Sequence, residues 1–346
     1  MSPACAVLES LPLRAPRPSV RPLGAPATSV RGTVTADLAL RHAGDHRIDV
    51  RYELQGDVAL PLVVVAGGIS ATRHVASSAD CPAAGWWDAQ VGDGLALDPR
   101  QHCILAIDWI GADGALDVAI DTADQADAIC AVLDALSLPR VALFVGCSYG
   151  AMVALQFAAV HGDRVDRVLA ISGCDRAHPY SSAARALQRR AVALGSLQCD
   201  SAAGLALARE LAMLTYRTPE EFASRFGAAP RLTQGRVRCA AEDYLDHCGQ
   251  RFAGTFSPTG FVRLSESLDL HDVAAEDIRV PVTVVTVEED RLVPHTDAAR
   301  LAARLGDNGE LHVLRSPYGH DAFLKEPAAV SVLLRDALCA CAGVSR

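Results

Sequence analysis

Ser148 stands in a pattern that is typical of a catalytic serine. Gly146-Cys-Ser148-Tyr-Gly150 follows the apolar residues Val141-Ala-Leu-Phe-Val, and a stretch with helical spacing comes directly after it. A sharp turn between a strand and a helix holds a serine hydroxyl clear of the sheet, and the small residues let strand and helix pass closely. A plain strand–turn–helix connection has the same short pattern. The flanking apolar strand and helix favour a nucleophile at Ser148.

A serine nucleophile needs a base, and the base needs a carboxylate that orients it. Asp290 follows the apolar run Val280–Val287, and His320 comes thirty residues later, after a further predicted strand. Taken alone, Asp290 has the features of a turn or helix cap, and His320 those of a loop histidine. Together they stand in one of the known chain orders of a triad. Three neighbouring acids compete with Asp290 for the orienting role: Glu288, Glu289 and Asp321.

Acyl chemistry also needs hydrogen-bond donors directed at the oxyanion that develops. The backbone N–H of Tyr149, directly after the nucleophile, is one expected donor. The second is expected from Gly67-Gly-Ile-Ser70, the loop after an apolar strand, and Ile69 is the best single candidate. A plain tight turn is the alternative reading of this loop.

The elements around these residues predict an α/β fold. Strand-like runs alternate with helical patterns, which indicates a mostly parallel sheet with helices on both faces. The predicted strands lie within Leu38–Leu54, where two strands pair, and at Pro61–Ala66, His102–Asp108, Val141–Val145, Val165–Ser172, Val280–Val287 and Glu310–Leu314.

Three regions follow from this pattern. Residues 1–36, rich in proline and arginine, are expected to form a disordered or loosely packed tail. Residues 37–172 and 271–346 form the core. Between them, residues 173–270 lack strand patterns, and we expect a helical lid over the carboxyl ends of the strands, where open α/β sheets bind ligands. Its expected helices are Arg185–Leu194, Ala202–Tyr216 and Pro219–Phe226.

Composition limits the kinds of partner. The chain has 346 residues, a net charge of −9 and 50% hydrophobic residues, which argues against a nucleic-acid surface and for a sizeable core. Eleven cysteines are scattered without a C-x-x-C pair, so we expect free thiols in the cytoplasm and neither a disulfide framework nor a metal site. No segment has the length and apolarity of a membrane span or the pattern of a secretory signal.

Several longer motifs together resemble one family. The chain from about Arg47 to Arg335 is similar to the MetX-type homoserine O-acyltransferases of the α/β-hydrolase superfamily, which act in methionine biosynthesis. The motifs are Gly85-Trp-Trp-Asp88, Gly94-Leu-Ala-Leu-Asp98, Leu214-Thr-Tyr-Arg217-Thr-Pro-Glu-Glu-Phe222 with Arg225-Phe-Gly, Leu268-Asp-Leu-His-Asp272 and Tyr318-Gly-His-Asp-Ala-Phe-Leu324.

The resemblance implies a ping-pong reaction. Ser148 would take an acyl group from acyl-CoA, the co-substrate, and pass it to the hydroxyl of L-homoserine. Arg217 would bind the carboxylate of the amino acid and Asp321 its amino group, whereas a solvated charge at a helix end is the other reading of Arg217. No metal or tightly held cofactor is implied, and a homodimer is expected.

The chain departs from the family pattern beside the nucleophile. Cys147, Tyr149 and Ala151 replace residues of the usual Gly-Gly-Ser-Met-Gly-Gly motif, and the bulk of Tyr149 would reshape the acyl pocket. Arg73 and His74 follow the oxyanion loop and would meet a succinyl carboxylate, unless they lie on the surface. We therefore favour succinyl-CoA over acetyl-CoA as the donor. L-serine as acceptor, an esterase or thioesterase, and a binding protein without activity are the alternatives.

Overall fold

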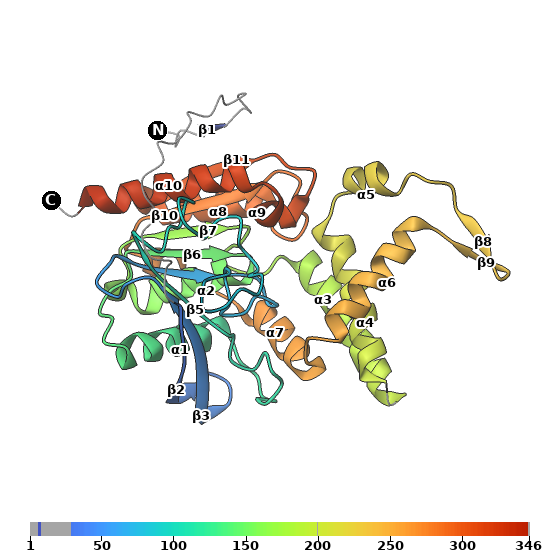
Figure 1. Cartoon of the computed structure of the whole chain (residues 1–346), viewed down its shortest axis with the longest axis horizontal. Coiled ribbons are helices and arrows are strands. Elements are labelled where there is room, and N and C mark those ends of the chain that lie inside the picture. The colour runs from blue at the N-terminus through green and yellow to red at the C-terminus, as the bar shows by residue number, and fades with distance from the viewer. Residues whose placement is uncertain (1–5, 8–28, 199, 345–346) are drawn as a thin grey trace.

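The computed structural model describes residues 6–7, 29–198 and 200–344 (Figure 1). Within these residues, nine strands form one sheet in the order β1-β11-β10-β7-β6-β4-β5-β3-β2. Neighbouring strands run parallel, except at one edge, where β3 runs antiparallel to both of its neighbours, β2 and β5. The predicted α/β fold with a mostly parallel sheet is confirmed. The strands are β1 Ala6–Val7, β2 Ser29–Leu40, β3 Gly44–Gln55, β4 Leu62–Ala66, β5 Cys103–Ile107, β6 Leu143–Cys147, β7 Val168–Ile171, β10 Val282–Val287 and β11 Gly309–Leu314.

Apolar cores lie on both faces of the sheet. In β4, Val64 and Ala66 belong to one core and Val63 and Val65 to the other, because successive side chains of a strand point to opposite faces. Both faces of a central parallel strand are covered by helices, so its sequence is continuously apolar. Residues of α1 (Thr122–Ala135), α2 (Tyr149–Val160) and α8 (His295–Leu305) join the first core, and residues of α10 (Pro327–Val344) join the second.

A helical insertion leaves the sheet after β7 and returns before β10 (Figure 1). The helix predicted at Pro219–Phe226 has the observed bounds, the one at Ala202–Tyr216 begins one residue earlier, and the one at Arg185–Leu194 is longer at both ends. The last two helices and a small hairpin, β8 (Arg231–Thr233) with β9 (Arg236–Arg238), were not predicted. The hairpin is too short and too exposed to show an apolar alternation. The helices are α3 Pro179–Leu197, α4 Ser201–Tyr216, α5 Pro219–Phe226, α6 Ala240–Ala253 and α7 Pro258–Leu270.

The predicted boundary of the N-terminal tail is wrong. Ser29–Ala36 belongs to β2, whose twelve residues pair with β3, and Ala6–Val7 pairs with β11. The alternating valines and threonines of β2 suit a pleated, half-exposed strand, but they were grouped with the preceding proline-rich residues. The rest of the predicted tail, residues 1–5 and 8–28, lies outside the described residues.

Capping residues begin the helices that matter for the site. At α1, Asp121 accepts hydrogen bonds from Ala123 N and Asp124 N, and Asp124 accepts one from Asp121 N, which satisfies N–H groups that the helix leaves free. At α5, Thr218 accepts from Glu221 N and Pro219 occupies the first turn. Among the helices of the described ranges, none is long and apolar enough to cross a membrane.

Candidate active site

The turn between β6 and α2 holds Ser148 in a strained backbone conformation. Its φ is 57° and its ψ is −117°, a region that residues with a side chain seldom adopt. A Cβ at Gly146 would lie 2.2 Å from Gly150 O, and a Cβ at Gly150 would lie 2.1 Å from Ala66 O. Only glycine fits at these two positions, so the predicted reason for the small residues is correct.

His320 and Asp290 lie beside Ser148 in the order that a triad requires. His320 Nε2 is 2.7 Å from Ser148 Oγ, and His320 Nδ1 is 2.7 Å from Asp290 Oδ2. The other carboxylate oxygen of Asp290 accepts hydrogen bonds from Leu292 N and Val293 N, at 2.8 and 3.1 Å. The backbone of the loop after β10 thus fixes the carboxylate, and the carboxylate fixes the imidazole.

The charge of a neighbouring carboxylate raises the pKa of His320. Burial by itself lowers the pKa of the imidazole, but the negative charge of Asp290 and its hydrogen bond outweigh burial, so the pKa lies above its ordinary value. The ring of Tyr216 stacks on the imidazole with centroids 5.9 Å apart. The histidine is therefore a base in a protein environment that supports its charged form.

The acids that competed with Asp290 have other partners. Glu288 forms an ion pair with Arg315, and Glu289 accepts a hydrogen bond from Ser316 N. Asp321 forms an ion pair with Arg217. Of the four acids, Asp290 is the one that contacts the ring of His320.

The loop after β4 lies against the nucleophile, as its prediction as an oxyanion loop requires. A Cβ at Gly68 would be 4.0 Å from Ser148 Cβ. Gly67 O accepts from Gly150 N, and Gly68 O accepts from Trp109 Nε1. These bonds hold the loop beside the nucleophile, and Ile69, the expected donor, lines the pocket next to Ser148.

Tyr149 follows Ser148 in the turn, but its side chain points into the core. The ring is fully buried, its hydroxyl is 2.7 Å from Ser267 Oγ, and it meets the Trp109 ring edge-on. The expectation that Tyr149 reshapes the acyl pocket is therefore wrong, because the first residue of α2 turns its side chain away from the cavity. Its backbone N–H still follows the nucleophile.

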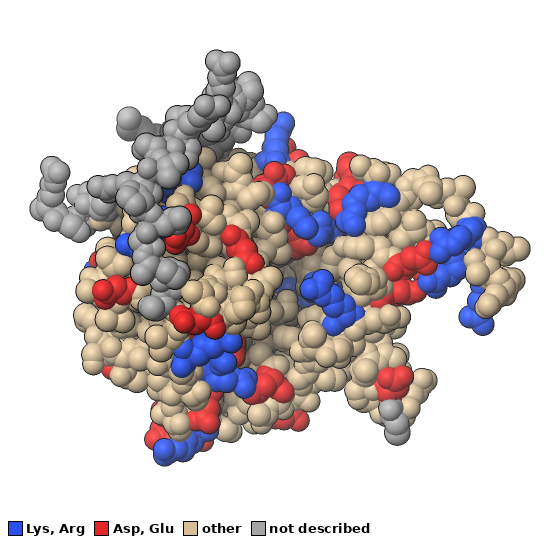
Figure 2. Space-filling model, viewed as in Figure 1, with Lys and Arg blue, Asp and Glu red and all other residues tan. Residues whose placement is uncertain are grey.

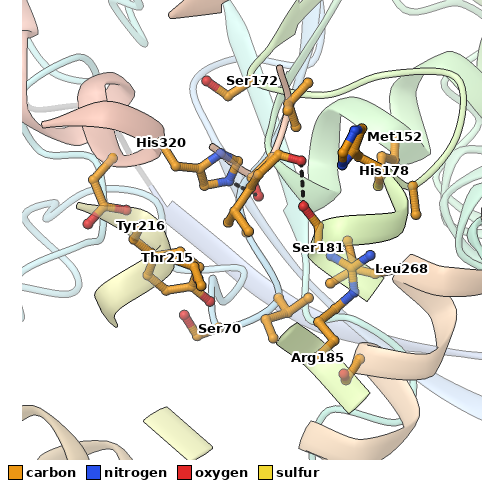
Figure 3. Close-up of a pocket in the computed structure, with 18 of the residues that line it drawn as sticks. Ser70, Met152, Ser172, His178, Ser181, Arg185, Thr215, Tyr216, Leu268 and His320 are labelled. Carbon is orange, nitrogen blue, oxygen red and sulfur yellow. Dashed lines mark hydrogen bonds between the residues drawn. The ribbon is translucent and has the colours of Figure 1, made fainter. Parts of the chain in front are cut away.

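A pocket of about 190 Å³ is lined by Ser148 and by residues of both the core and the insertion. Figure 3 shows His320 of the core with Arg185 and Tyr216 of the insertion around it. Figure 2 shows the surface hollowed between these two parts, with basic side chains beside the hollow. The polar and charged residues that line the pocket include Ser148, His320, Asp321, Arg185, Arg209 and Arg176.

Three arginines of this lining, Arg176, Arg185 and Arg209, were missed by the sequence reasoning. The guanidinium of Arg209 lies over the rings of Tyr216 and Phe252, 5.3 and 4.9 Å from their centroids. Arg185 is 2.6 Å from Asp269. Arg209 lies seven residues before Tyr216 on α4, so both share a helix face, and that spacing is the signal that could have identified it.

Arg217 lies directly behind the pocket, beside Asp321. Its Nε is 2.9 Å from Asp321 Oδ2 and its Nη1 is 3.4 Å from Glu221 Oε1, and its side chain is buried outside the pocket lining. The helix α4 ends at Tyr216, and Arg217 has extended backbone. Its burial excludes a solvated helix-end charge, and its contact with a substrate carboxylate stays a prediction.

Arg73 and His74 do not reach the pocket either. Arg73 pairs with Asp108 at 3.3 Å and His74 with Glu53 at 3.1 Å, and neither lines the cavity. They therefore carry no argument for a succinyl donor. Within the described ranges, no group of three metal-ligating side chains comes together.

Similarity to known proteins now identifies the family. A family model for the alpha/beta hydrolase fold matches residues 61–327. A homoserine O-succinyltransferase from Xanthomonas campestris pv. campestris is 56% identical over 310 residues, which cover 90% of this chain and 84% of that protein. A homoserine O-acetyltransferase from Thermus thermophilus is 32% identical over 280 residues, with coverages of 72% and 71%. The chain belongs to the homoserine O-acyltransferase family.

Solved structures show how widely this fold is shared. A homoserine O-acetyltransferase from Bacillus anthracis has a TM-score of 0.79 at 16% identity and covers 90% of this chain and 97% of its own. The esterase E22 has a TM-score of 0.80 at 16% identity, with coverages of 90% and 100%. The fold thus serves a transferase and an esterase alike. What distinguishes a homoserine O-acyltransferase from a hydrolase must lie in the side chains of the pocket.

Proposed function

We propose that this chain transfers the acyl group of succinyl-CoA to the side-chain hydroxyl of L-homoserine, through an ester on Ser148. The observation that carries the proposal is one pocket in which the Ser148–His320 hydrogen bond lies beside the cation of Arg209 and the carboxylate of Asp321. An amino acid presents a carboxylate and an ammonium, and these two side chains have the complementary charges. The family resemblance implies that the reaction belongs to methionine biosynthesis.

In the first half-reaction Ser148 Oγ attacks the thioester carbonyl, and His320 Nε2 takes the hydroxyl proton. The backbone N–H groups of Ile69 and Tyr149 stabilise the oxyanion. The C–S bond then breaks, and CoA leaves as a thiol with the proton from His320. Asp290 keeps the imidazole oriented and stabilises its charged form.

In the second half-reaction the homoserine hydroxyl attacks the ester on Ser148. His320 takes the proton of that hydroxyl, and the second oxyanion uses the same two N–H groups. The ester bond to Ser148 breaks, Ser148 Oγ regains a proton from His320, and the O-acyl amino acid leaves. Arg209 and Asp321 hold the amino acid so that its hydroxyl, and not water, is the attacking group.

Arg185 favours a donor with a terminal carboxylate. Its side chain lines the pocket and forms an ion pair with Asp269. Asp269 also forms an ion pair with Arg189, at 2.8 Å. One carboxylate balances two guanidiniums, so positive charge remains for an anionic acyl group. The 56% identity to a homoserine O-succinyltransferase supports the same donor.

We also propose that acyl-CoA is the only cofactor-like molecule in the reaction, and that no metal takes part. Full activity after dialysis against a chelator would agree with this. The family resemblance further implies a homodimer in the cytoplasm, and light scattering of the purified chain would measure its mass.

The test is a matrix of two donors and two acceptors. Succinyl-CoA or acetyl-CoA is mixed with the protein and with homoserine, serine or no acceptor, while free thiol is followed. We expect fast thiol release with succinyl-CoA and homoserine only. Equal rates with and without acceptor would make the chain a thioesterase, and a preference for serine would move the acceptor to the alternative within the family.

A substitution at Arg185 tests the preference for the donor separately from the other functions of the site. Arg185→Met should raise KM for succinyl-CoA about tenfold and leave acetyl-CoA unchanged, because one charge-assisted hydrogen bond is lost while Arg189 still neutralises Asp269. Steady-state kinetics with both donors measures this. Arg190→Met, on the exposed side of the same helix, is the control, and an equal effect of the Arg185 variant on both donors would contradict the role.

A further inference from the structure

Two backbone N–H groups beside the nucleophile have no acceptor among the residues that the structure describes. They belong to Ile69, in the loop after β4, and to Tyr149, in the turn before α2. Ala71 N in the same loop and Gly150 N in the same turn donate hydrogen bonds, but these two do not. Both residues are buried, and buried N–H groups are nearly always paired. Two free donors next to Ser148 are what the stabilisation of an oxyanion requires.

The peptide between Gly68 and Ile69 determines where the Ile69 N–H points. In a planar trans peptide the C=O and the N–H point in opposite directions. Gly68 O accepts hydrogen bonds from Trp109 Nε1 at 3.0 Å and from Ala71 N at 2.9 Å. Trp109 belongs to the apolar core, whereas Gly68 and Ile69 line the pocket. Because the carbonyl is directed at the core, the Ile69 N–H is directed to the pocket side.

The loop needs such an anchor because its own residues leave it conformationally free. Gly67 and Gly68 stand side by side, and glycine restricts the backbone least. A Cβ at Gly67 would lie 2.5 Å from Ala71 Cβ, so glycine is required there for the close passage. A catalytic group that is misplaced by about 1 Å can cost roughly 100-fold in rate. Hydrogen bonds from outside the loop therefore have to fix its position.

The segment that carries Trp109 is itself held firmly. Gln125, a buried residue of α1, accepts from Ile110 N and donates to Ile110 O, both at 3.0 Å. Asp108 Oδ1 accepts a hydrogen bond from Arg73 N at 2.8 Å, so the same segment also fixes the far end of the loop. The indole of Trp109 is thus a rigid support for the Gly68 carbonyl.

Trp109 also contacts the residue that carries the second free donor. Its ring meets the ring of Tyr149 edge-on, with centroids 5.0 Å apart and planes at 77°. The hydroxyl of Tyr149 is 2.7 Å from Ser267 Oγ, so the Tyr149 ring is held at both ends. One side chain therefore joins the two parts of the backbone from which the free N–H groups come, although Trp109 does not line the pocket.

We propose that Trp109 is a positioning residue for the oxyanion hole. Its indole N–H holds the Gly68 carbonyl, so that the N–H groups of Ile69 and Tyr149 converge on the oxyanion at Ser148. The inference rests on the proposed function only in that Ser148 carries the acyl group. Both half-reactions form an oxyanion at this position, so Trp109 acts on both rates and not on the binding of substrates.

The test removes the indole N–H and keeps the ring. The principal variant is Trp109→3-benzothienylalanine, in which sulfur replaces the N–H at nearly constant volume, and Trp109→Phe is the second. Stopped-flow acylation of Ser148 by p-nitrophenyl acetate is measured first, because any ester needs the oxyanion hole. Rapid-quench rates of acylation by succinyl-CoA and of transfer to homoserine follow, together with the dissociation constant of CoA.

Trp87→Phe is the matched control. Its indole N–H also donates to a backbone carbonyl, Phe323 O, at 3.0 Å, and Trp87 is as buried as Trp109. This variant loses the same kind of hydrogen bond away from the oxyanion loop. It should lose stability toward urea like Trp109→Phe but retain the wild-type rates of both half-reactions.

Trp109→3-benzothienylalanine should lower the rates of acylation and of transfer by the same factor, about tenfold, as expected for one lost hydrogen bond. The dissociation constant of CoA should not change. Unchanged rates in this variant, or an equal loss of rate in Trp87→Phe, would overturn the inference. A wild-type protein that reacts with p-nitrophenyl acetate but does not transfer succinyl to homoserine would refute the proposed function alone, since the ester still compares the Trp109 variants. A wild-type protein that neither compound acylates would refute both.

Discussion

His320 lies between two carboxylates of different function. Asp290 contacts its Nδ1, and Asp321 follows it in the chain and faces the pocket. The charges of both raise the pKa of the imidazole, although burial opposes them. A base with this environment accepts a proton readily, but it is also protonated by solvent at a higher pH than an ordinary histidine.

The pH profile should therefore depend on Asp290. The base must be neutral to act, so kcat/KM should fall as the pH drops through a pKa above 6.5, the ordinary value. In Asp290→Asn the charge that raises the pKa is gone, so the acid limb should move to lower pH. Its kcat should fall by roughly 10³- to 10⁴-fold, because the amide no longer orients the correct tautomer.

The profile of kcat/KM from pH 5 to 9 measures both effects. Glu288→Gln is the control, since its carboxylate pairs with Arg315 and not with the histidine. An acid limb at the same pH in wild type and Asp290→Asn would show that Asp290 does not act on His320 as described.

Residues on the sheet edge could be predicted from the sequence. Ser148, Asp290 and His320 each follow a strand, and parallel strands bring their carboxyl ends to one edge. The side chains of the insertion could not be predicted in this way. The orientation of α3 and α4 about their axes, relative to the pocket, decides that Arg185 and Arg209 face it, and their own patterns do not contain this orientation.

At the scale of elements, one histidine joins the insertion to the core. His271 Nε2 is 2.9 Å from Cys174 O, where the chain enters the insertion, and Nδ1 is 2.7 Å from Thr122 Oγ1 at the start of α1. Burial lowers the pKa of His271 to about 4. The segment that enters the insertion, the segment that leaves it and the first turn of α1 thus meet at His271, whose imidazole is neutral.

Stability should consequently decline in mild acid. The pKa of His271 is depressed in the folded state, so its contribution is complete above the unfolded value of 6.5 and is lost as the pH falls toward 4. The loss amounts to about 3 kcal/mol at most. Urea unfolding at pH 7, 5 and 4 should show a smaller decline for His271→Gln than for wild type. His46→Gln, at the partly exposed start of β3, should follow wild type, and parallel curves for all three proteins would exclude this role.

Predictions at the level of elements failed where packing overrides composition. The strand β2 begins at Ser29 because its partner β3 offers twelve residues for pairing, while the proline-rich residues before it suggested a longer tail. Tyr149 has the bulk to fill an acyl pocket, but the close passage of α2 over the sheet directs it to Ser267 and Trp109. The first outcome depends on pairing with the strand that follows β2, and the second on contacts with residues that are distant from Tyr149 in the chain.

At the scale of the whole molecule, the two parts divide the reaction between them. The core supplies the nucleophile, the base and the oxyanion loop, and the insertion supplies the arginines that line the pocket and that we propose select substrates. The net charge of −9 does not oppose an anionic donor, because some of the basic side chains lie beside the hollow between the parts (Figure 2). A hydrolase and a transferase can share the nucleophile, the base and the oxyanion loop, so we propose that the insertion, together with Asp321 of the core, decides the acceptor.

The most direct test of the account follows the acyl group itself. The protein is mixed with succinyl-CoA alone and quenched, and its peptides are analysed by mass spectrometry. We predict one succinyl group on the peptide at Ser148, which homoserine then removes within the mixing time as O-succinylhomoserine, while Ser148→Ala remains unlabelled. A label on Cys147 in that variant, or a label on Ser148 that water removes as fast as homoserine does, would contradict the central claim.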